Sequence, residues 1–243
     1  MAHPITFLWT VPRSVSTSFE RMMIERGDHI VFHEPYSRSY YLGPEQRSDR
    51  YAVAGAHHSV DAVTAELQEA ARSAPVFAKD MAYHAIDLVD PEVLAGFRHS
   101  FLIRHPAATL RSLASRWPDF TDAEAGWAAL GRLVDLVQTG AELPVVIEAE
   151  RVCADPPGVV AAWCDAMGLP FVADALDWEP GMRPEWELWE SWHASSAVAT
   201  GFEPLAEAKP LTAGDAPRVH EAHGSALVVY ERLKSHAITS SGR

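Results

Sequence analysis

The stretch from Ile5 to Met23 constrains the fold more than any other part of this sequence. An apolar run from Ile5 to Trp9 breaks at Val11-Pro12, and one arginine, several hydroxyl residues and an amphipathic segment follow. This order predicts a strand, a tight loop and a helix. The loop then brings free backbone N–H groups and the positive end of the helix dipole to one point beside the Arg13 guanidinium, where a phosphate or sulfate group can bind. The alternative is an ordinary strand and helix whose serines only cap the helix.

This loop differs from the nucleotide loop of ATPases and GTPases. That loop requires the pattern G-x-x-x-x-G-K-[ST], in which the lysine reaches the phosphates and the hydroxyl binds Mg²⁺. Here no glycine lies between Met1 and Arg26, and the first lysine is Lys79. The sequence therefore predicts an anion site and gives no sign of a site for a metal-chelated triphosphate.

A second stretch has the same organisation. Phe101 to Ile103 are predicted to form a strand that ends at Arg104. Pro106 then begins a helix, a position that suits proline because a backbone N–H there would have no partner within the helix. Ser112 lies eight residues after Arg104, two turns into that helix. In a parallel α/β sheet, ligands bind beyond the carboxyl ends of the strands, so Arg13 and Arg104 are expected at the same site.

Together the two stretches resemble the binding elements of the sulfotransferase family that uses 3′-phosphoadenosine 5′-phosphosulfate (PAPS). Pro12-Arg13-Ser14-x-Ser16-Thr17 matches the P-[RK]-S-G-[ST]-T loop that holds the 5′-phosphosulfate in that family. Arg104 and Ser112 match its R-x₇-S pair, which holds the 3′-phosphate. The resemblance implies that these residues, with Val15 and Ser18 of the loop, bind PAPS and its product adenosine 3′,5′-bisphosphate. Val15 replaces the usual glycine, and because a β-branched residue resists positive φ, we expect the loop to be shaped without it.

Further matches extend the resemblance, which is to a bacterial small-molecule branch of the family, over about residues 5–203. His33-Glu34-Pro35-Tyr36 follows the second predicted strand, residues 77–81 end the third, and a Trp-rich stretch closes in Thr200-Gly201-Phe202. In the family, the segment before the last helix folds over the nucleotide. The resemblance therefore makes Arg183, Thr200 and Gly201 candidates for donor contact.

The acceptor must lose a proton as it attacks the sulfuryl group, so a base is expected opposite the loop, while Arg13 and the N–H groups of residues 14–18 stabilise the leaving phosphate. His33 and Glu34 end the second strand, which we expect beside the first. The family uses a histidine or a glutamate as base, and its glutamate-using branches favour Glu34, with His33 second. Two alternatives stay open: Glu34 pairs with an arginine such as Arg13 or Arg38, and Lys79 either touches the transferred group or pairs with Asp80.

The acceptor is expected to be a small organic molecule that carries a hydroxyl or an amine, and the setting to be secondary metabolism. Tyrosines at 36, 40, 41 and 51 and the tryptophans from 178 to 192 suggest a compact pocket instead of a long basic groove for a polysaccharide. Aromatic residues at such spacings more often pack than bind, so core or lid packing is the favoured interpretation of the tryptophans. An inactive nucleotide-binding module, or a P-loop kinase or hydrolase of related fold, is the alternative function.

Bulk composition narrows the class of protein. The chain has 33 acidic and 20 basic side chains, a net charge of −13, which disfavours binding to nucleic acid or to an anionic membrane. Cys153 and Cys164 give neither a disulfide framework nor a metal-ligand spacing, and His57-His58 lacks a third ligand, so no metal site is predicted. No signal peptide or long apolar span is evident, and a cytoplasmic protein is expected.

Strand and helix patterns alternate along the chain. This alternation predicts an α/β fold, a three-layer parallel sheet with helices on both faces, and the resemblance implies a P-loop nucleotide-hydrolase-like architecture. We expect a single domain over 1–235 and a disordered tail over 236–243, and we expect Tyr36–His58 to be irregular. The predicted strands are 5–10, 29–33, 76–79, 100–104 and 145–148, and the predicted helices are 15–26, 60–73, 91–97, 107–117, 122–139, 157–167 and 216–234.

Overall fold

Parallel strands form the centre of the structure. The computed structural model describes residues 2–51, 55–138 and 144–240. Within these ranges one five-stranded sheet has the order β2-β3-β1-β4-β5, and every neighbouring pair is parallel. The strands are β1 (Ile5–Thr10), β2 (Ile30–His33), β3 (Val76–Met81), β4 (Arg98–Ile103) and β5 (Val145–Glu148). All five lie where the sequence pattern predicted them, within two residues at each end.

The strand order corrects one expectation. We expected β2 beside β1, but β3 pairs with both and separates them. The burial of the strands gives the reason: every residue of β3 is buried, as suits an interior strand, whereas the four residues of β2 are only partly buried and suit an edge. Lys79 on β3 therefore lies between the ends of β1 and β2.

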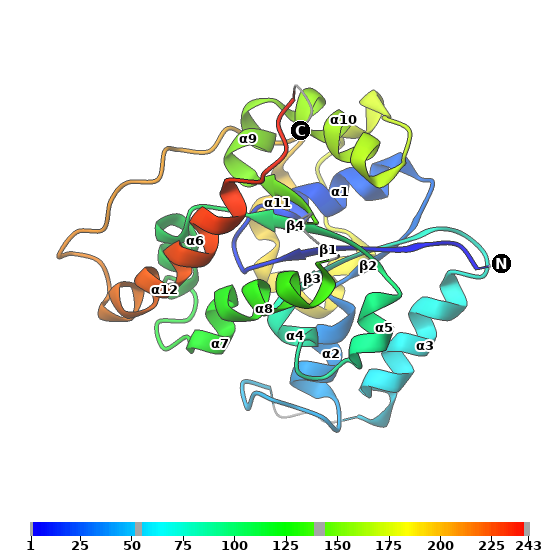
Figure 1. The fold of residues 1–243 in the computed structure, drawn as a ribbon, viewed down its shortest axis with the longest axis horizontal. Helices are drawn as coiled ribbons and strands as arrows, with labels where there is room; N and C mark the ends of the chain where they lie inside the picture. The colour runs from blue at the N-terminus through cyan, green and yellow to red at the C-terminus, as the bar shows by residue number, and fades with distance from the viewer. Residues whose placement is uncertain (1, 52–54, 139–143, 241–243) are drawn as a thin grey trace.

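One face of the sheet packs against α1 (Ser16–Arg26), α9 (Ala149–Ala154) and α10 (Pro156–Met167), which lie above the sheet in Figure 1. Leu8 of β1 and Leu102 of β4 point to this side, where they join Phe19 of α1 and Trp163 of α10 in one apolar cluster. The 3₁₀ segment η2 (Ala173–Leu176) closes this layer. Alternate strand residues thus form the core of the upper layer, as the period of two requires.

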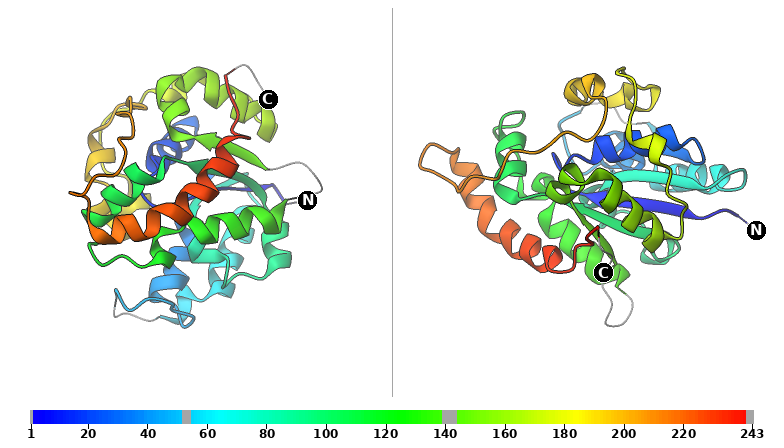
Figure 2. Two further views of the ribbon diagram at one scale, coloured as in Figure 1. Left: turned by 60° about the vertical axis from the view of Figure 1, so that its left-hand side comes forward. Right: turned by 90° about the horizontal axis from the view of Figure 1, so that it is seen from above.

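The other face packs against α3 (Val60–Ala70), α5 (Pro91–Ala95), α6 (Pro106–Ala114), α8 (Trp127–Val137) and α12 (Pro217–Lys234). Phe7 and Trp9 of β1 point to this side and stack on each other with ring centroids 4.3 Å apart. Figure 2 shows the same layers from two other sides, with α12 crossing the front of the left-hand view. Helices therefore cover both faces of the sheet, and the predicted three-layer α/β fold is confirmed.

Several short helices differ from the predicted pattern. The helix expected over 122–139 is two helices, α7 (Asp122–Ala125) and α8, because Gly126 takes a left-handed φ of 78° and ends the first of them. Pro35 starts α2 (Pro35–Leu42) inside the segment expected to be irregular. The remaining short elements are η1 (Ala56–His58), α4 (Ala82–Ala85), η3 (Pro184–Trp192) and α11 (Ala194–Val198).

Part of the segment expected to be a disordered tail packs against the sheet. Ile238 is buried, and its backbone N–H donates to the carbonyl of Val146 on β5 at 2.9 Å. Residues 241–243 lie outside the described part of the chain, and the extent of the domain stays a prediction. None of the described helices is long and apolar enough to cross a membrane.

The break between α7 and α8 gives the first test. A Cβ at Gly126 would lie 3.3 Å from Pro12 Cδ and from Tyr83 Cδ1, in a backbone conformation that L-residues avoid. We expect Gly126→Ala to lower the free energy of unfolding by about 1–2 kcal/mol, measured by urea denaturation. Gly224→Ala is the matched control: this glycine lies inside α12 with nothing within 4 Å of the added Cβ, so the change should stabilise the protein by about 0.5–1 kcal/mol. The same sign for both variants would contradict this account.

Candidate active site

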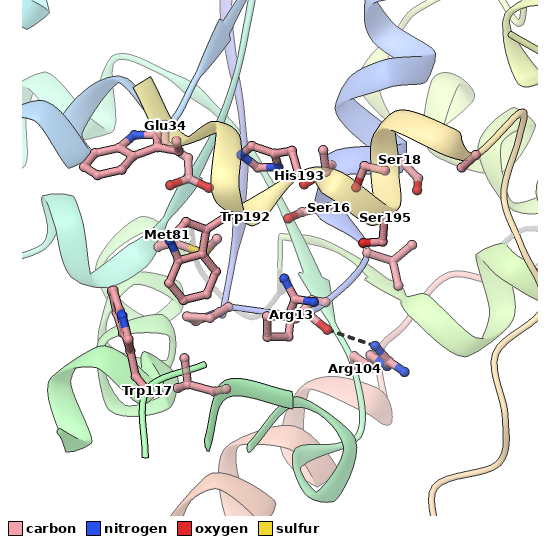
Figure 3. A pocket seen from close by; sticks show the side chains of 18 of the residues that line it. Arg13, Ser16, Ser18, Glu34, Met81, Arg104, Trp117, Trp192, His193 and Ser195 are labelled. Carbon is pink, nitrogen blue, oxygen red and sulfur yellow. Dashed lines mark hydrogen bonds between the residues drawn. The ribbon is translucent and has the colours of Figure 1, made fainter. Parts of the chain in front are cut away.

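A cavity of about 470 Å³ opens at the carboxyl ends of the strands. Its walls include Arg13 in the loop after β1, Glu34 after β2, Met81 at the end of β3 and Arg104 after β4. The segment from η3 to α11 crosses over it and adds Trp192, His193 and Ser195 (Figure 3). In Figure 3 the two arginines lie on one side with Ser16, Ser18 and Ser195, and Glu34, Met81 and Trp117 lie on the other. The pocket therefore has two chemically different sides.

The first side is built by residues 12–18, all of which line the pocket. Ser18 N and Phe19 N donate to Val15 O, whereas no described residue accepts a hydrogen bond from the backbone N–H groups of Ser14, Val15, Ser16 or Thr17. These N–H groups open the first turn of α1, where the helix dipole favours an anion. The predicted loop is thus present, with its donors free.

The backbone around the pocket is strained at three positions. Arg13, Val15 and Glu34 have φ values of 67°, 67° and 44°, and they are the non-glycine residues with positive φ in the described ranges. All three line the pocket. The expectation that the loop would be shaped without positive φ is wrong, because Val15 itself adopts a φ of 67°. Its carbonyl accepts two hydrogen bonds and its side chain packs on the upper apolar cluster, and these contacts offset the strain.

Uncompensated positive charge gathers on the same side. Arg104 Nη1 donates to Arg13 O at 3.0 Å, drawn as the dashed line in Figure 3, and Arg13 Nε donates to Ser112 Oγ at 2.9 Å. Burial, together with Arg116 and Arg104, lowers the pKa of Arg13. No carboxylate of the described residues pairs with any of these three arginines, and Arg104 Nε is buried without a partner. Arginines left unpaired in a chain of net charge −13 indicate an anion site.

Four residues expected to contact the donor do not line the pocket. Ser112 lies behind Arg13 and accepts its hydrogen bond, so Arg13 joins the predicted Arg104–Ser112 pair. Arg183 lies near Glu185, with Nε 3.7 Å from Oε2. The carbonyl of Thr200 accepts a hydrogen bond from Trp178 N, and Gly201 follows it. The segment reaches the pocket instead through its neighbours Val198, Ala199, Glu203 and Leu205.

A buried network of charges stands behind the second side. Lys79 Nζ lies 2.5 Å from Glu34 Oε1 and 3.8 Å from Glu20 Oε2, while His33 Nδ1 lies 2.8 Å from Glu20 Oε2. Glu34 therefore pairs with Lys79 and with neither Arg13 nor Arg38, and Lys79 does not pair with Asp80. The position of β3 between β1 and β2 explains both results. Glu34 is the member of this network that lines the pocket, and its side chain is 13 % exposed.

The charge state of Glu34 follows from these contacts. Burial alone would raise its pKa, but the ammonium of Lys79, with His33 and His84, outweighs burial and holds the pKa far below its ordinary value of 4.5. Glu34 is therefore a carboxylate at neutral pH. A carboxylate held so firmly in the charged form is a weak base.

Glu20 and His193 belong to the site although the sequence patterns did not indicate them. Glu20 is fully buried on α1, where it also accepts a hydrogen bond from Trp186 Nε1 at 2.7 Å. His193 lines the pocket, and its ring centroid lies 4.5 Å from that of His33. Burial is the main cause that lowers the pKa of His193 to about 3, and the nearby positive charges of Lys79 and His33 lower it further. An acidic residue on the apolar face of the first helix was the available signal for Glu20. His193 lies in a segment with an irregular backbone, and no sequence pattern there indicated its place in the site.

Aromatic side chains complete the second side. Tyr41, Tyr51, Tyr83, Trp117, Trp189 and Trp192 all line the pocket. Trp178 and Trp186 are buried and do not line the pocket, so the packing role predicted for the tryptophans applies to these two. Trp189 and Trp192 line the cavity. Within the ranges described, no group of three or more His, Cys, Asp or Glu residues is placed to hold a metal ion.

Comparisons with known proteins agree with this geometry. A family model described as a sulfotransferase domain matches residues 5–237. Two Arabidopsis thaliana proteins named branched-chain-amino-acid aminotransferase-like protein 2 and protein 1 are 28 % and 29 % identical over 80 % and 83 % of this chain. The chain spans only 35 % and 37 % of their length.

A solved structure shares the fold. The sulfotransferase domain of the Synechococcus PCC 7002 olefin synthase has a TM-score of 0.55 and 15 % sequence identity, and the match covers 96 % of both chains. At this identity the likeness concerns the fold.

The strain at Val15 can be measured. Both Val15→Gly and Val15→Ala remove the side chain, but only glycine adopts a φ of 67° without steric cost. We therefore expect Val15→Gly to be more stable than Val15→Ala by about 1 kcal/mol in urea denaturation. Equal stability of the two variants would show that the loop is not strained at this residue.

The Glu34–Lys79 pair predicts a pH dependence of stability. Because the folded state lowers the pKa of Glu34, the pair stabilises the fold above about pH 4.5 and loses this effect as the pH falls. Glu34→Gln leaves a buried ammonium and should destabilise the protein by about 3 kcal/mol at pH 7. The difference from the unmutated protein should shrink steadily below about pH 4.5. A difference that stays constant to pH 2 in denaturant titrations would contradict the assignment.

Proposed function

The chain belongs to the sulfotransferase domain family, and we propose that it moves a sulfuryl group from PAPS to a hydroxyl or amine of a small organic acceptor. One observation carries the proposal. Arg13 and Arg104 face the pocket without a carboxylate partner among the described residues, beside the free N–H groups that open α1. This anion site shares one cavity with an aromatic wall suited to an organic acceptor.

On the donor side we assign the 5′-phosphosulfate to residues 12–18 and the 3′-phosphate to Arg104. The residues fit such a ligand, since the unpartnered Nε of Arg104 and the N–H groups of residues 14–17 are donors that two anionic groups would satisfy. Ser112 acts through Arg13, which it holds. Contacts of Arg183, Thr200 and Gly201 with the donor stay predictions.

The reaction needs alignment and charge stabilisation more than covalent help. The acceptor oxygen or nitrogen forms a bond to sulfur, and the bond from sulfur to the bridging phosphate oxygen breaks with its electron pair staying on the phosphate. Arg13 and the N–H groups at the start of α1 stabilise the charge that develops there. Glu34 faces the acceptor side of the pocket, and Lys79 and His33 lie beside its carboxylate.

Two other functions use the same fold. A non-catalytic module would bind adenosine 3′,5′-bisphosphate without transferring a sulfuryl group, and a kinase or hydrolase would consume ATP with Mg²⁺. The absence of a P-loop lysine before Lys79 disfavours the second of these. A role in secondary metabolism and a cytoplasmic location stay predictions from the sequence.

The donor assignment predicts a preference between nucleotides. Adenosine 3′,5′-bisphosphate should bind more tightly than AMP, because Arg104 is available to the additional phosphate. Loss of a charge-assisted hydrogen bond is worth about 1.5–3 kcal/mol, so Arg104→Ala should weaken binding of the bisphosphate by about 10- to 100-fold in calorimetry and leave AMP almost unaffected.

Arg98→Ala is the matched control, because Arg98 begins the same strand at the opposite end of the sheet. Equal affinities of the unmutated protein for the two nucleotides would overturn the donor assignment. Mg²⁺-dependent ATP turnover would instead favour the kinase or hydrolase, and nucleotide binding without transfer from radiolabelled PAPS to any acceptor would favour the inactive module.

A further inference from the structure

The acceptor side of the pocket contains a histidine that neither the sequence nor the family match assigns to the reaction. We propose that His84, oriented by Asp80, is the catalytic base that takes the proton of the acceptor, and that the acceptor is a hydroxyl group on an uncharged aromatic molecule. This inference rests on the proposed function, since it names the base and the acceptor class for the same pocket.

Asp80 fixes both the position and the tautomer of His84. Asp80 Oδ1 lies 2.7 Å from His84 Nδ1 and also accepts a hydrogen bond from Met81 N, while Oδ2 accepts one from Tyr36 N at 2.7 Å. A buried carboxylate held by two backbone N–H groups cannot turn away. Because Asp80 accepts hydrogen bonds, the neutral form of the imidazole carries its proton on Nδ1, which leaves the lone pair on Nε2.

That lone pair has no partner in the described part of the protein. His84 Nε2 is buried without a hydrogen bond, although His84 lines the pocket. The imidazole contacts the rings of Tyr83 and Tyr40, with centroid distances of 4.2 and 5.3 Å. An imidazole oriented by a carboxylate, with its other nitrogen unpartnered, on a residue that lines the cavity has the geometry that general-base catalysis uses.

The other candidates for the base are less suitable. Glu34 is paired with Lys79 at 2.5 Å, and its lowered pKa makes it a weak base. His33 lies outside the pocket wall and directs Nδ1 to Glu20. His193 lines the pocket, but no carboxylate orients it and burial lowers its pKa to about 3.

The walls around His84 define the acceptor. The aromatic residues that line this side include Tyr41, Trp117 and Trp189, and their rings contact one another at centroid distances of 5.6 and 6.4 Å from Tyr41. Arg50 covers the Trp117 ring at 4.2 Å, but Glu124 and Asp119 neutralise it. The cations that line the pocket are thus Arg13 and Arg104 on the donor side. An anionic acceptor would find no free cation on the aromatic side, because Lys79 is already paired with Glu34, whereas a flat neutral ring would stack on the walls.

The proposed step balances without a further reactant. The acceptor oxygen forms a bond to the sulfur of PAPS while its proton moves to His84 Nε2. The bond between sulfur and the phosphate oxygen breaks, and the electron pair leaves with adenosine 3′,5′-bisphosphate. Release of the proton from His84 to solvent restores the base for the next turnover.

The experiment uses the full chain, PAPS and 2-naphthol as a probe, with 2-naphthyl sulfate measured by chromatography. We expect His84→Gln to lower kcat by about 10²–10⁴-fold, with the dissociation constant for adenosine 3′,5′-bisphosphate changed less than about twofold. Asp80→Asn should lower kcat in the same direction, because Asp80 is a positioning residue that acts through His84. His220→Gln, a histidine on α12 outside the pocket wall, is the matched control and should leave the rate unchanged.

Chemical rescue separates a catalytic role from a structural one. Imidazole added to folded His84→Gly should restore part of the lost rate, and it should do nothing for Glu34→Gln. Full activity of His84→Gln, with a loss confined to Glu34→Gln, would return the role of base to Glu34 and overturn the inference.

The acceptor class is tested with a charged analogue of the probe. 6-Hydroxy-2-naphthoate should be sulfated with a kcat/KM at least about tenfold below that of 2-naphthol, because its carboxylate would be desolvated on the aromatic side without a free cation to pair with. Equal rates, or no transfer to 2-naphthol by a protein that binds the bisphosphate, would overturn the acceptor class and leave the donor assignment standing. Failure to bind the bisphosphate would refute the proposed function itself.

Discussion

Parallel pairing of β1 with β3 and β4 is the constraint on which the site depends. It brings the carboxyl ends of the strands to one edge of the sheet, where Arg13, Glu34, Met81 and Arg104 line a single cavity. The bond from Arg104 to the Arg13 carbonyl then ties the end of β4 to the strained loop after β1. Under the proposed function, an anion bound between the two guanidiniums would offset the cost of that strain and of their mutual repulsion.

Most of the fold could be predicted because local patterns agree with the tertiary structure. The buried strands are short apolar runs, and Pro106 marks the start of its helix directly. The strand order could not be predicted, since it depends on whether β3 or β2 is more fully buried, a property of the assembled sheet. The ordered Ile238 was missed for the same reason: one apolar residue near a polar end gives no periodic signal.

The candidate site also has parts that the sequence could predict and parts that it could not. Motif residues adjacent in the sequence, such as Arg13 and Ser16, could be placed because a strand–loop–helix positions them locally. The partners of Glu34 could not, because the neighbour of Glu34 is Lys79 on a strand inserted between β1 and β2. Val15 shows the limit of residue preferences: its hydrogen bonds and packing hold a conformation that its side chain disfavours. His84 required the structure, because its free nitrogen and its Asp80 partner are facts of geometry.

A crystal structure with adenosine 3′,5′-bisphosphate tests the central claim most directly. The account predicts the 5′-phosphate at the start of α1, within hydrogen-bond distance of the N–H groups of residues 14–17, and the 3′-phosphate against Arg104. It also predicts that the aromatic side beside His84 stays open for an acceptor. Density for the nucleotide outside this pocket, or with its adenine filling the space between Trp117 and Trp189, would contradict the assignment of the two sides.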